Sequence, residues 1–187
     1  MHEMKLLTAL LSLALALPLA AQMPQPTPEH QKLAVFVGVW DAQMEYVGMD
    51  GKPAKSNGTY VRKQPMGAFW LVDNFQAQMM GQQFRGHGTT GYDPAKKKYV
   101  GSWVDSMTPS MMVTEGSFDK TGKILTMSGM GPGHDGTPVV HRTVTTIKDK
   151  NTHVFEMFIP TPDGTEMKMM TIVYKRRVKV LDKVPGK

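Results

Sequence analysis

The sequence predicts an all-β protein: an antiparallel up-and-down β-barrel of about ten strands with a short N-terminal helix. Three observations support this prediction. About ten short segments of strand-like composition follow one another at regular spacing, joined by tight turns. No helical stretch of crossover length separates any two of them, which excludes a parallel sheet. An open sheet of ten strands would leave two unpaired edges, so we favour closure into a barrel over a β-sandwich.

The chain is expected to begin with a targeting segment, residues 1–21. In this segment Lys5 precedes an apolar run, residues 6–19, and small residues follow up to Ala21, as in a signal peptide. The apolar run is shorter than the roughly 20 residues that a membrane-spanning helix needs. We therefore expect cleavage after Ala21, no stable membrane insertion afterwards, and an exported protein, periplasmic or secreted. The alternative is a retained N-terminal anchor.

The remaining chain is divided into a leader, one domain and a tail. Residues 22–28 contain three prolines and are expected to form an extended leader. Residues 29–178 are expected to form a single β-barrel domain, and residues 179–187 a flexible C-terminal tail. The chain has no cysteine, so this domain must be stable without disulfides, and its length allows that. The formal charge of +6 is spread along the strands, so we expect no nucleic-acid partner.

The first elements of the domain have clear signals. Residues 29–36 follow Pro28 with helical spacing, which predicts one or two helical turns. The first long strand begins at Gly38, and its apolar and polar side chains alternate as in a half-buried antiparallel strand. Its apolar face carries Trp40, Ala42, Met44 and Tyr46. Later strands are predicted near residues 56–64, 68–78, 82–92, 98–106, 111–119, 123–130, 139–148, 153–160 and 165–177.

One predicted hairpin, residues 84–106, carries candidate ligand-binding side chains. Asp93 and Pro94 favour its turn. On the outgoing strand, Trp103 and Asp105 share a face near the strand end. If this face looks inward, Asp105 could orient a ligand. The alternative, which we favour, is that Asp105 braces the strand against the following turn.

The tripeptide Gly38-Val39-Trp40, following a short helix, resembles the Gly-x-Trp signature of lipocalin-like (calycin) barrels. The resemblance implies that Trp40 packs across the closed end of the barrel. It also implies that a basic residue of the last strand, Arg176 or Arg177, covers the indole in a cation–π contact.

Further motifs follow along the chain: Phe84-Arg85-Gly86-His87-Gly88, Gly91-Tyr92-Asp93, Trp103-Val104-Asp105-Ser106-Met107, Glu115-Gly116-Ser117-Phe118-Asp119, Phe155-Glu156-Met157, Asp163-Gly164-Thr165-Glu166 and Met167–Lys175. Together these motifs resemble one family, the bacterial domain of unknown function 1579 (DUF1579). This resemblance covers residues 29–177 and implies an exported protein with a calycin-like fold, but no reaction. Tyr92 and Asp93 belong to its structural signature, with Gly38, Trp40 and Arg176.

The leading functional hypothesis is a barrel whose interior, lined by methionine and aromatic side chains, binds a small apolar or amphipathic ligand. Arg142 is expected on the inward face, between Val140 and Val144. There it would either clamp a carboxylate ligand or, as we favour, pair with Asp105 or Glu156, because a lone buried charge is too costly. The candidate ligand-binding residues are Met44, Tyr46, Trp103, Asp105, Arg142, Met167 and Met169.

A second hypothesis is a copper-binding protein of the periplasm. The chain contains 17 methionines, and Met167 and Met169 share a strand face. Soft thioethers select Cu(I). Methionine is also a flexible filler of apolar cores and pockets. We favour this role of methionine as a filler over copper binding, and we assign no metal and no cofactor.

A third hypothesis is an enzyme with a site at the barrel mouth, using Asp105, Arg142 and a histidine. No nucleophile motif surrounds Ser106, so no catalytic residue is assigned and we expect binding rather than catalysis. None of the histidines has the spacing of a zinc site. His153 could serve as a single haem ligand, as in distantly related barrels. We favour structural roles for His87, His134, His141 and His153.

Overall fold

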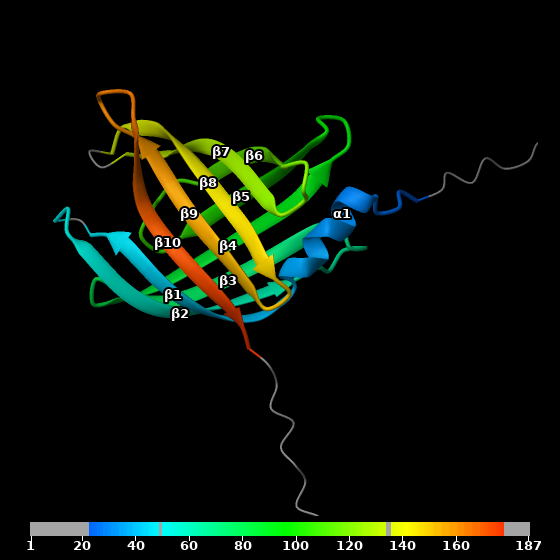
Figure 1. Ribbon diagram of the computed structural model, residues 1–187, viewed down its shortest axis with the longest axis horizontal. Helices are drawn as coiled ribbons and strands as arrows, with labels where there is room; N and C mark the ends of the chain where they lie inside the picture. Colours follow the sequence, from blue (N-terminus) through cyan, green and yellow to red (C-terminus); the bar gives the residue numbers. More distant parts are fainter. Residues whose placement is uncertain (1–22, 49, 134–135, 178–187) are drawn as a thin grey trace, which may run out of the picture.

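The computed structural model describes residues 23–48, 50–133 and 136–177. The predicted targeting segment at 1–21, His134 and the predicted tail at 179–187 lie outside the described residues. Ten antiparallel strands close into a barrel in which each strand pairs with its neighbour in sequence and β10 pairs with β1 (Figure 1). The predicted fold class is confirmed.

All ten predicted strands are present. The second strand begins at Pro53, three residues before its predicted start, because its pairing with β1 continues to the turn. The helical elements are α1 (Pro28–Lys32) and the 3₁₀ helix η1 (Leu33–Phe36). The strands are β1 (Gly38–Val47), β2 (Pro53–Lys63), β3 (Trp70–Met79), β4 (Gln82–Asp93), β5 (Lys98–Asp105), β6 (Met112–Phe118), β7 (Ile124–Pro132), β8 (Pro138–Asp149), β9 (Thr152–Pro160) and β10 (Glu166–Arg176).

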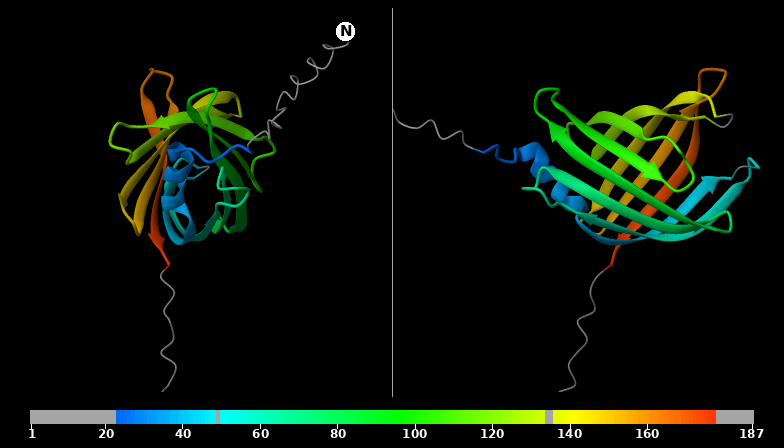
Figure 2. Two further views of the ribbon diagram at one scale, coloured as in Figure 1. Left: turned by 90° about the vertical axis from the view of Figure 1, so that its right-hand side faces the viewer. Right: turned by 180° about the vertical axis from the view of Figure 1, so that it is seen from behind.

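The N-terminal helical segment covers one end of the barrel. Figure 2 shows α1 in front of this end, which we call the closed end. Leu33 and Phe36 of η1 are buried there against Leu71, Tyr99 and Leu125. The opposite end, which we call the mouth, is formed by the β1–β2, β3–β4, β5–β6, β7–β8 and β9–β10 turns. In the described part of the chain, no helix is long and apolar enough to cross a bilayer.

Trp40 ties β1 to the closed end. Its side chain is 1% exposed, and its Nε1 donates a hydrogen bond to the Phe36 carbonyl at 2.8 Å. The Arg176 guanidinium lies over the indole at 4.1 Å and donates to the Val35 and Val37 carbonyls. The expected contact between this tryptophan and the last strand is therefore made by Arg176.

Gly38 makes room for this arginine. Its φ is +147°, which L side chains rarely adopt, and a Cβ at this position would collide with the Arg176 guanidinium. Arg177 instead pairs with Asp41 on the outer surface. The glycine and the tryptophan of the Gly-x-Trp motif thus serve the same contact.

Candidate ligand-binding cavity

The barrel encloses a cavity of about 370 Å³, within the usual range for small-molecule sites. Its wall is mainly apolar because the side chains of each strand alternate between the lumen and the outer surface. The methionines in the wall are Met44, Met79, Met107, Met112, Met127, Met157 and Met170. The aromatic side chains in the wall are Phe36, Tyr60, Phe75, Phe84, Trp103, Phe155 and Tyr174.

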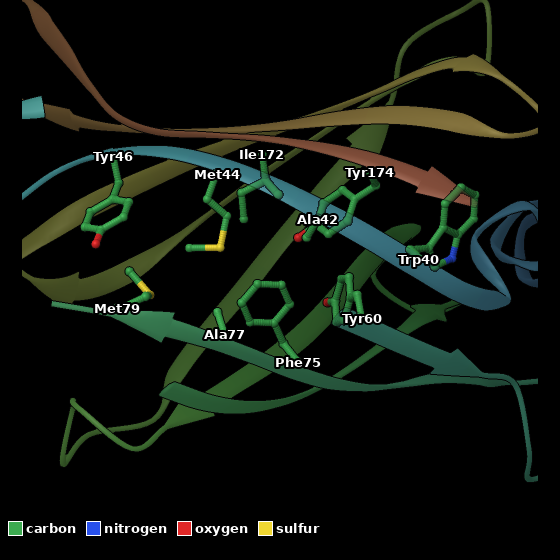
Figure 3. Packing of buried hydrophobic residues seen from close by; sticks show 10 residues of the cluster. All are labelled: Trp40, Ala42, Met44, Tyr46, Tyr60, Phe75, Ala77, Met79, Ile172 and Tyr174. Carbon is green, nitrogen blue, oxygen red and sulfur yellow. The ribbon is translucent and has the colours of Figure 1, made fainter. Parts of the chain in front are cut away.

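Part of this wall is visible in Figure 3. Met44 of β1 and Ile172 of β10 extend into the lumen from one side, and Phe75 and Met79 of β3 extend from the other. The two groups come from strands that the closed sheet brings face to face. The lumen therefore has an apolar lining over much of its length.

Trp103 lies in the wall near the mouth. Its strand, β5, pairs with β4 so that Gly88 stands opposite Trp103, and Gly86 stands opposite Asp105. A Cβ on either glycine would collide with the indole. The absence of a side chain at Gly86 and at Gly88 thus lets the Trp103 ring lie against β4 without filling the lumen.

A buried ion pair lies at the closed end of the cavity. Arg62 of β2 and Asp73 of β3 stand directly opposite each other. The guanidinium donates from Nε to Oδ1 at 2.9 Å and from Nη2 to Oδ2 at 3.1 Å, and the two side chains are 11% and 5% exposed. Tyr60 donates a third hydrogen bond to Oδ2 at 2.8 Å. Because the carboxylate accepts all three bonds, its charge is compensated despite burial.

His153 of β9 lies beside this pair. Its ring stacks on Tyr174 at 4.6 Å and meets the edges of Trp40 and Phe36, and its buried Nε2 has no hydrogen-bond partner. Burial and the nearby charges of Arg62 and Arg176 lower the pKa of His153 to about 3. The imidazole is therefore neutral at physiological pH. Its enclosed Nε2 leaves no open side for an iron atom, so the residues present do not fit a haem bound through this nitrogen.

The family of the chain follows from its sequence match. Residues 25–176 match the family model described as Protein of unknown function (DUF1579). The chain belongs to the DUF1579 family. No curated protein matches the chain.

Two solved structures share the barrel fold and are distant in sequence from this DUF1579 chain. Rv2717c from M. tuberculosis aligns with a TM-score of 0.61 at 14% identity, covering 81% of this chain and 99% of its own. The S-type phycobiliprotein lyase CPES from Guillardia theta aligns with a TM-score of 0.56 at 10% identity, covering 82% and 99%. At these identities the similarity is one of fold.

The residues predicted on β1 face inward in this DUF1579 barrel. Met44 lines the cavity. Tyr46 is buried nearer the mouth, outside the cavity lining, and its hydroxyl accepts a hydrogen bond from the Met80 amide at 3.4 Å. Tyr92 and Asp93, predicted as signature residues, lie at the end of β4, where Asp93 caps the turn by accepting bonds from the Ala95 and Lys96 amides.

Asp105 lines the cavity near the mouth, with both carboxylate oxygens occupied. Oδ2 accepts from Trp103 Nε1 at 3.0 Å, and Oδ1 accepts from the Met107 and Thr108 amides at 2.9 and 2.8 Å. The carboxylate thus holds the indole on one side and the β5–β6 turn on the other. This is the bracing geometry that we favoured, and a role in orienting a ligand stays a prediction.

The expected inward position of Arg142 is wrong. On β8 it is His141, Thr143 and Thr145 that line the cavity, so Arg142 points outward. Its guanidinium stacks on Phe158 at 4.2 Å and pairs with Glu166, donating from Nε to Oε1 at 2.8 Å. Its partner is therefore neither Asp105 nor Glu156.

This placement separates the side chains required by the mouth-enzyme hypothesis. Arg142 lies on the outer surface, whereas Asp105 lies in the cavity wall. The two valines that flank Arg142 are on the outer face as well, which is why the apolar pattern was misleading. The hypothesis has no geometric support in the described residues.

Met167 and Met169 also lie outside the cavity lining. The pairing of β9 with β10 shifts between Lys168 and Met170, which places an extra residue, Met169, in the last strand. A bulge of this kind reverses the alternation of side chains. Met170 lines the cavity, whereas Met167 pairs with Ile159 near the mouth, where it is 41% exposed.

Sequence reasoning missed the ion pair at the closed end and most of the methionines in the wall. A signal for the pair was present. Asp73 stands on the face of its strand that otherwise carries Leu71, Phe75, Ala77 and Met79, and a lone carboxylate on an apolar face requires a partner. The inward position of Met170 carries no comparable signal, because the bulge in β10 is not readable from the pattern.

Proposed function

We propose that the lumen of this barrel binds a small apolar or amphipathic molecule. The observation that carries the proposal is the cavity of about 370 Å³, whose mainly apolar wall is rich in methionine and aromatic side chains. Methionine side chains adapt to ligands of different shape, and aromatic rings supply a large contact area. Binding would take place after export, for which the composition of residues 1–21 is the support.

The test of this proposal reduces the space in the lumen without changing the outer surface. The uncharged fluorescent probe N-phenyl-1-naphthylamine is titrated into the protein and into two variants. Thr145→Phe places a ring in the cavity, whereas Thr146→Phe, the matched control, places the same ring on the outer face of β8. We expect Thr145→Phe to weaken binding by about tenfold or more, because each 1.4 kcal/mol of lost contact is a factor of ten.

The control variant should bind the probe as the unchanged protein does. Circular dichroism of each variant shows that the barrel remains folded. Absence of probe binding to the unchanged protein, or equal binding by both folded variants, would contradict binding in the lumen.

A second candidate function, binding of Cu(I), is favoured by one contact in the cavity wall. His141 Nε2 lies 2.9 Å from the Pro132 carbonyl, which can only accept, so in the neutral ring Nε2 carries the proton. The lone pair on Nδ1 then faces the Met157 sulfur at 3.4 Å. Met170, which also lines the cavity, stands directly opposite Met157.

This geometry has room for a soft metal ion. With metal–ligand distances of about 2.0 Å to nitrogen and about 2.3 Å to sulfur, as at zinc, the 3.4 Å separation corresponds to a nitrogen–metal–sulfur angle of about 105°. This is close to the tetrahedral angle. Imidazole and thioether ligands together suit Cu(I).

Equilibrium dialysis under reducing conditions tests this candidate with Cu(I) alone. We expect Met157→Leu to weaken Cu(I) binding by about tenfold or more, because leucine keeps the volume and removes the sulfur. Met167→Leu is the matched control, because Met167 is exposed and outside the cavity lining. Equal binding by the two variants would exclude a site at Met157.

A further inference from the structure

We propose that the cavity takes a ligand with a carboxylate head and an apolar tail, and that the head lies at the closed end beside Arg62 and Tyr174. This inference rests on the proposed function and names the class and orientation of the ligand. It comes from the distribution of polar groups along the lumen. Of the described residues, only three charged side chains line the cavity: Arg62, Asp73 and Asp105.

Arg62 has hydrogen-bonding capacity left over after pairing. Asp73 accepts from Nε and Nη2. Nη1 is left without a hydrogen-bond partner among the described residues. A guanidinium presents five N–H donors, so a second carboxylate can bind beside the first.

Tyr174 supplies a second donor next to this guanidinium. Its ring lies 5.1 Å from the Tyr60 ring, and the Arg62 guanidinium in turn lies over Tyr60 at 4.6 Å. Figure 3 shows the two tyrosine rings side by side near Trp40. Burial raises the pKa of Tyr174 far above its usual value, so the hydroxyl keeps its proton. Within the described part of the chain this hydroxyl has no hydrogen-bond partner, although it belongs to a cavity-lining residue.

These side chains form one connected wall at the closed end. Arg62 lies over Phe36 as well as over Tyr60, Phe36 meets His153, and His153 stacks on Tyr174. Because Tyr174 also packs against Tyr60, these contacts form a closed ring of side chains. The ring fixes the direction of the unpartnered donors of Arg62 and Tyr174. A head group placed there meets preorganised donors.

The charges along the lumen favour the same orientation. Arg62 and Arg176 both disfavour a proton on His153, whereas Asp73, the one carboxylate among the described cavity-lining residues at this end, is engaged by Arg62 and Tyr60. The charged side chain of the wall near the mouth is the carboxylate of Asp105. An anionic head is repelled at the mouth and attracted at the closed end, while the tail meets methionines on the way.

The test compares two ligands that have alkyl tails and differ in the head, with an uncharged aromatic probe as the reference. Dodecanoate, dodecyltrimethylammonium and the uncharged N-phenyl-1-naphthylamine are measured by calorimetry or fluorescence at about 0.3 M salt, where the Debye length is short and surface charges are screened. We expect dodecanoate to bind about tenfold or more tightly than the ammonium compound. Tyr174→Phe is expected to weaken dodecanoate binding by about tenfold, the usual effect of losing a hydrogen bond to a charged group, and to leave the uncharged probe unaffected.

Two further variants complete this test. Tyr92→Phe is the matched control, because Tyr92 is outside the cavity lining, and it should bind dodecanoate normally. The double variant Arg62→Met with Asp73→Leu removes the guanidinium without leaving a lone buried charge. It should lose the preference for dodecanoate over the ammonium compound while still binding the uncharged probe.

The possible results separate this inference from the function on which it rests. If the uncharged probe binds but the head group makes no difference, or if Tyr174→Phe and Tyr92→Phe behave alike, the proposed orientation is wrong and binding in the lumen stands. If no probe binds to the unchanged protein, both proposals fail. A preference for the ammonium compound would overturn the assignment of an anionic head.

Discussion

Replacing Asp73 with alanine is expected to destabilise the barrel by about 3–5 kcal/mol, because the change leaves the Arg62 guanidinium buried without its counter-charge. Arg62 is 11% exposed, so water can compensate little of the lost pairing. Tyr60 would lose its acceptor as well. Urea denaturation followed by circular dichroism measures the change in the free energy of unfolding.

Two comparisons show whether the cost comes from burial of the lone charge. The double variant Arg62→Met with Asp73→Leu should recover most of the stability, because it replaces both charges by apolar side chains. Glu45→Ala is the control for an exposed pair, since Glu45 and Lys55 also lie on adjacent strands but both face solvent. A loss for Asp73→Ala no larger than that for Glu45→Ala would contradict the buried ion pair.

Acid is expected to destabilise the protein through His153. The pKa of this side chain is about 3 in the folded barrel and near 6.5 in the unfolded chain. Between these values the unfolded chain binds a proton that the folded barrel does not bind, so stability rises with pH. Below pH 6.5 the free energy of unfolding should therefore fall by about 1.4 kcal/mol for each pH unit, down to about pH 3.

The variant His153→Phe isolates this contribution. It keeps an aromatic ring against Tyr174 and removes both the titrating group and the unpartnered nitrogen, so it should unfold less readily in acid than the unchanged protein. Carboxylates titrate in both proteins, and the difference between the two denaturation series removes their effect. His87→Phe, on the exposed outer face of β4, is the control and should keep the original pH dependence. Identical slopes for the unchanged protein and His153→Phe would contradict a lowered pKa of His153 in the folded barrel.

The strand alternation of β1 shows how much local pattern could predict. Trp40, Ala42, Met44 and Tyr46 alternate with polar residues over a regular strand, and all four are buried as expected. The contact between Trp40 and the last strand followed from the family resemblance, and the structure assigns it to Arg176 rather than Arg177. The difference between these neighbours depends on register, which only the closed sheet defines.

The errors arose where local pattern and tertiary pairing disagree. Arg142 stands between valines, yet packing against Phe158 and Glu166 holds that face of β8 on the outside. Met167 and Met169 share a face only in a regular strand, and the bulge before Met170 reverses the alternation. Neither feature leaves a signal within its own segment of sequence.

The sequence by itself determined the fold class, the approximate positions of ten strands and the apolar, methionine-rich nature of the interior, because these follow from side-chain alternation and turn chemistry. The tertiary structure alone decided which polar groups meet inside the barrel. Arg62 and Asp73 are separated along the chain and become partners only through the register of β2 and β3. Closure of the sheet then places Tyr174 and His153 beside them. The candidate binding site is thus a product of register and closure, which depend on pairing across the whole barrel.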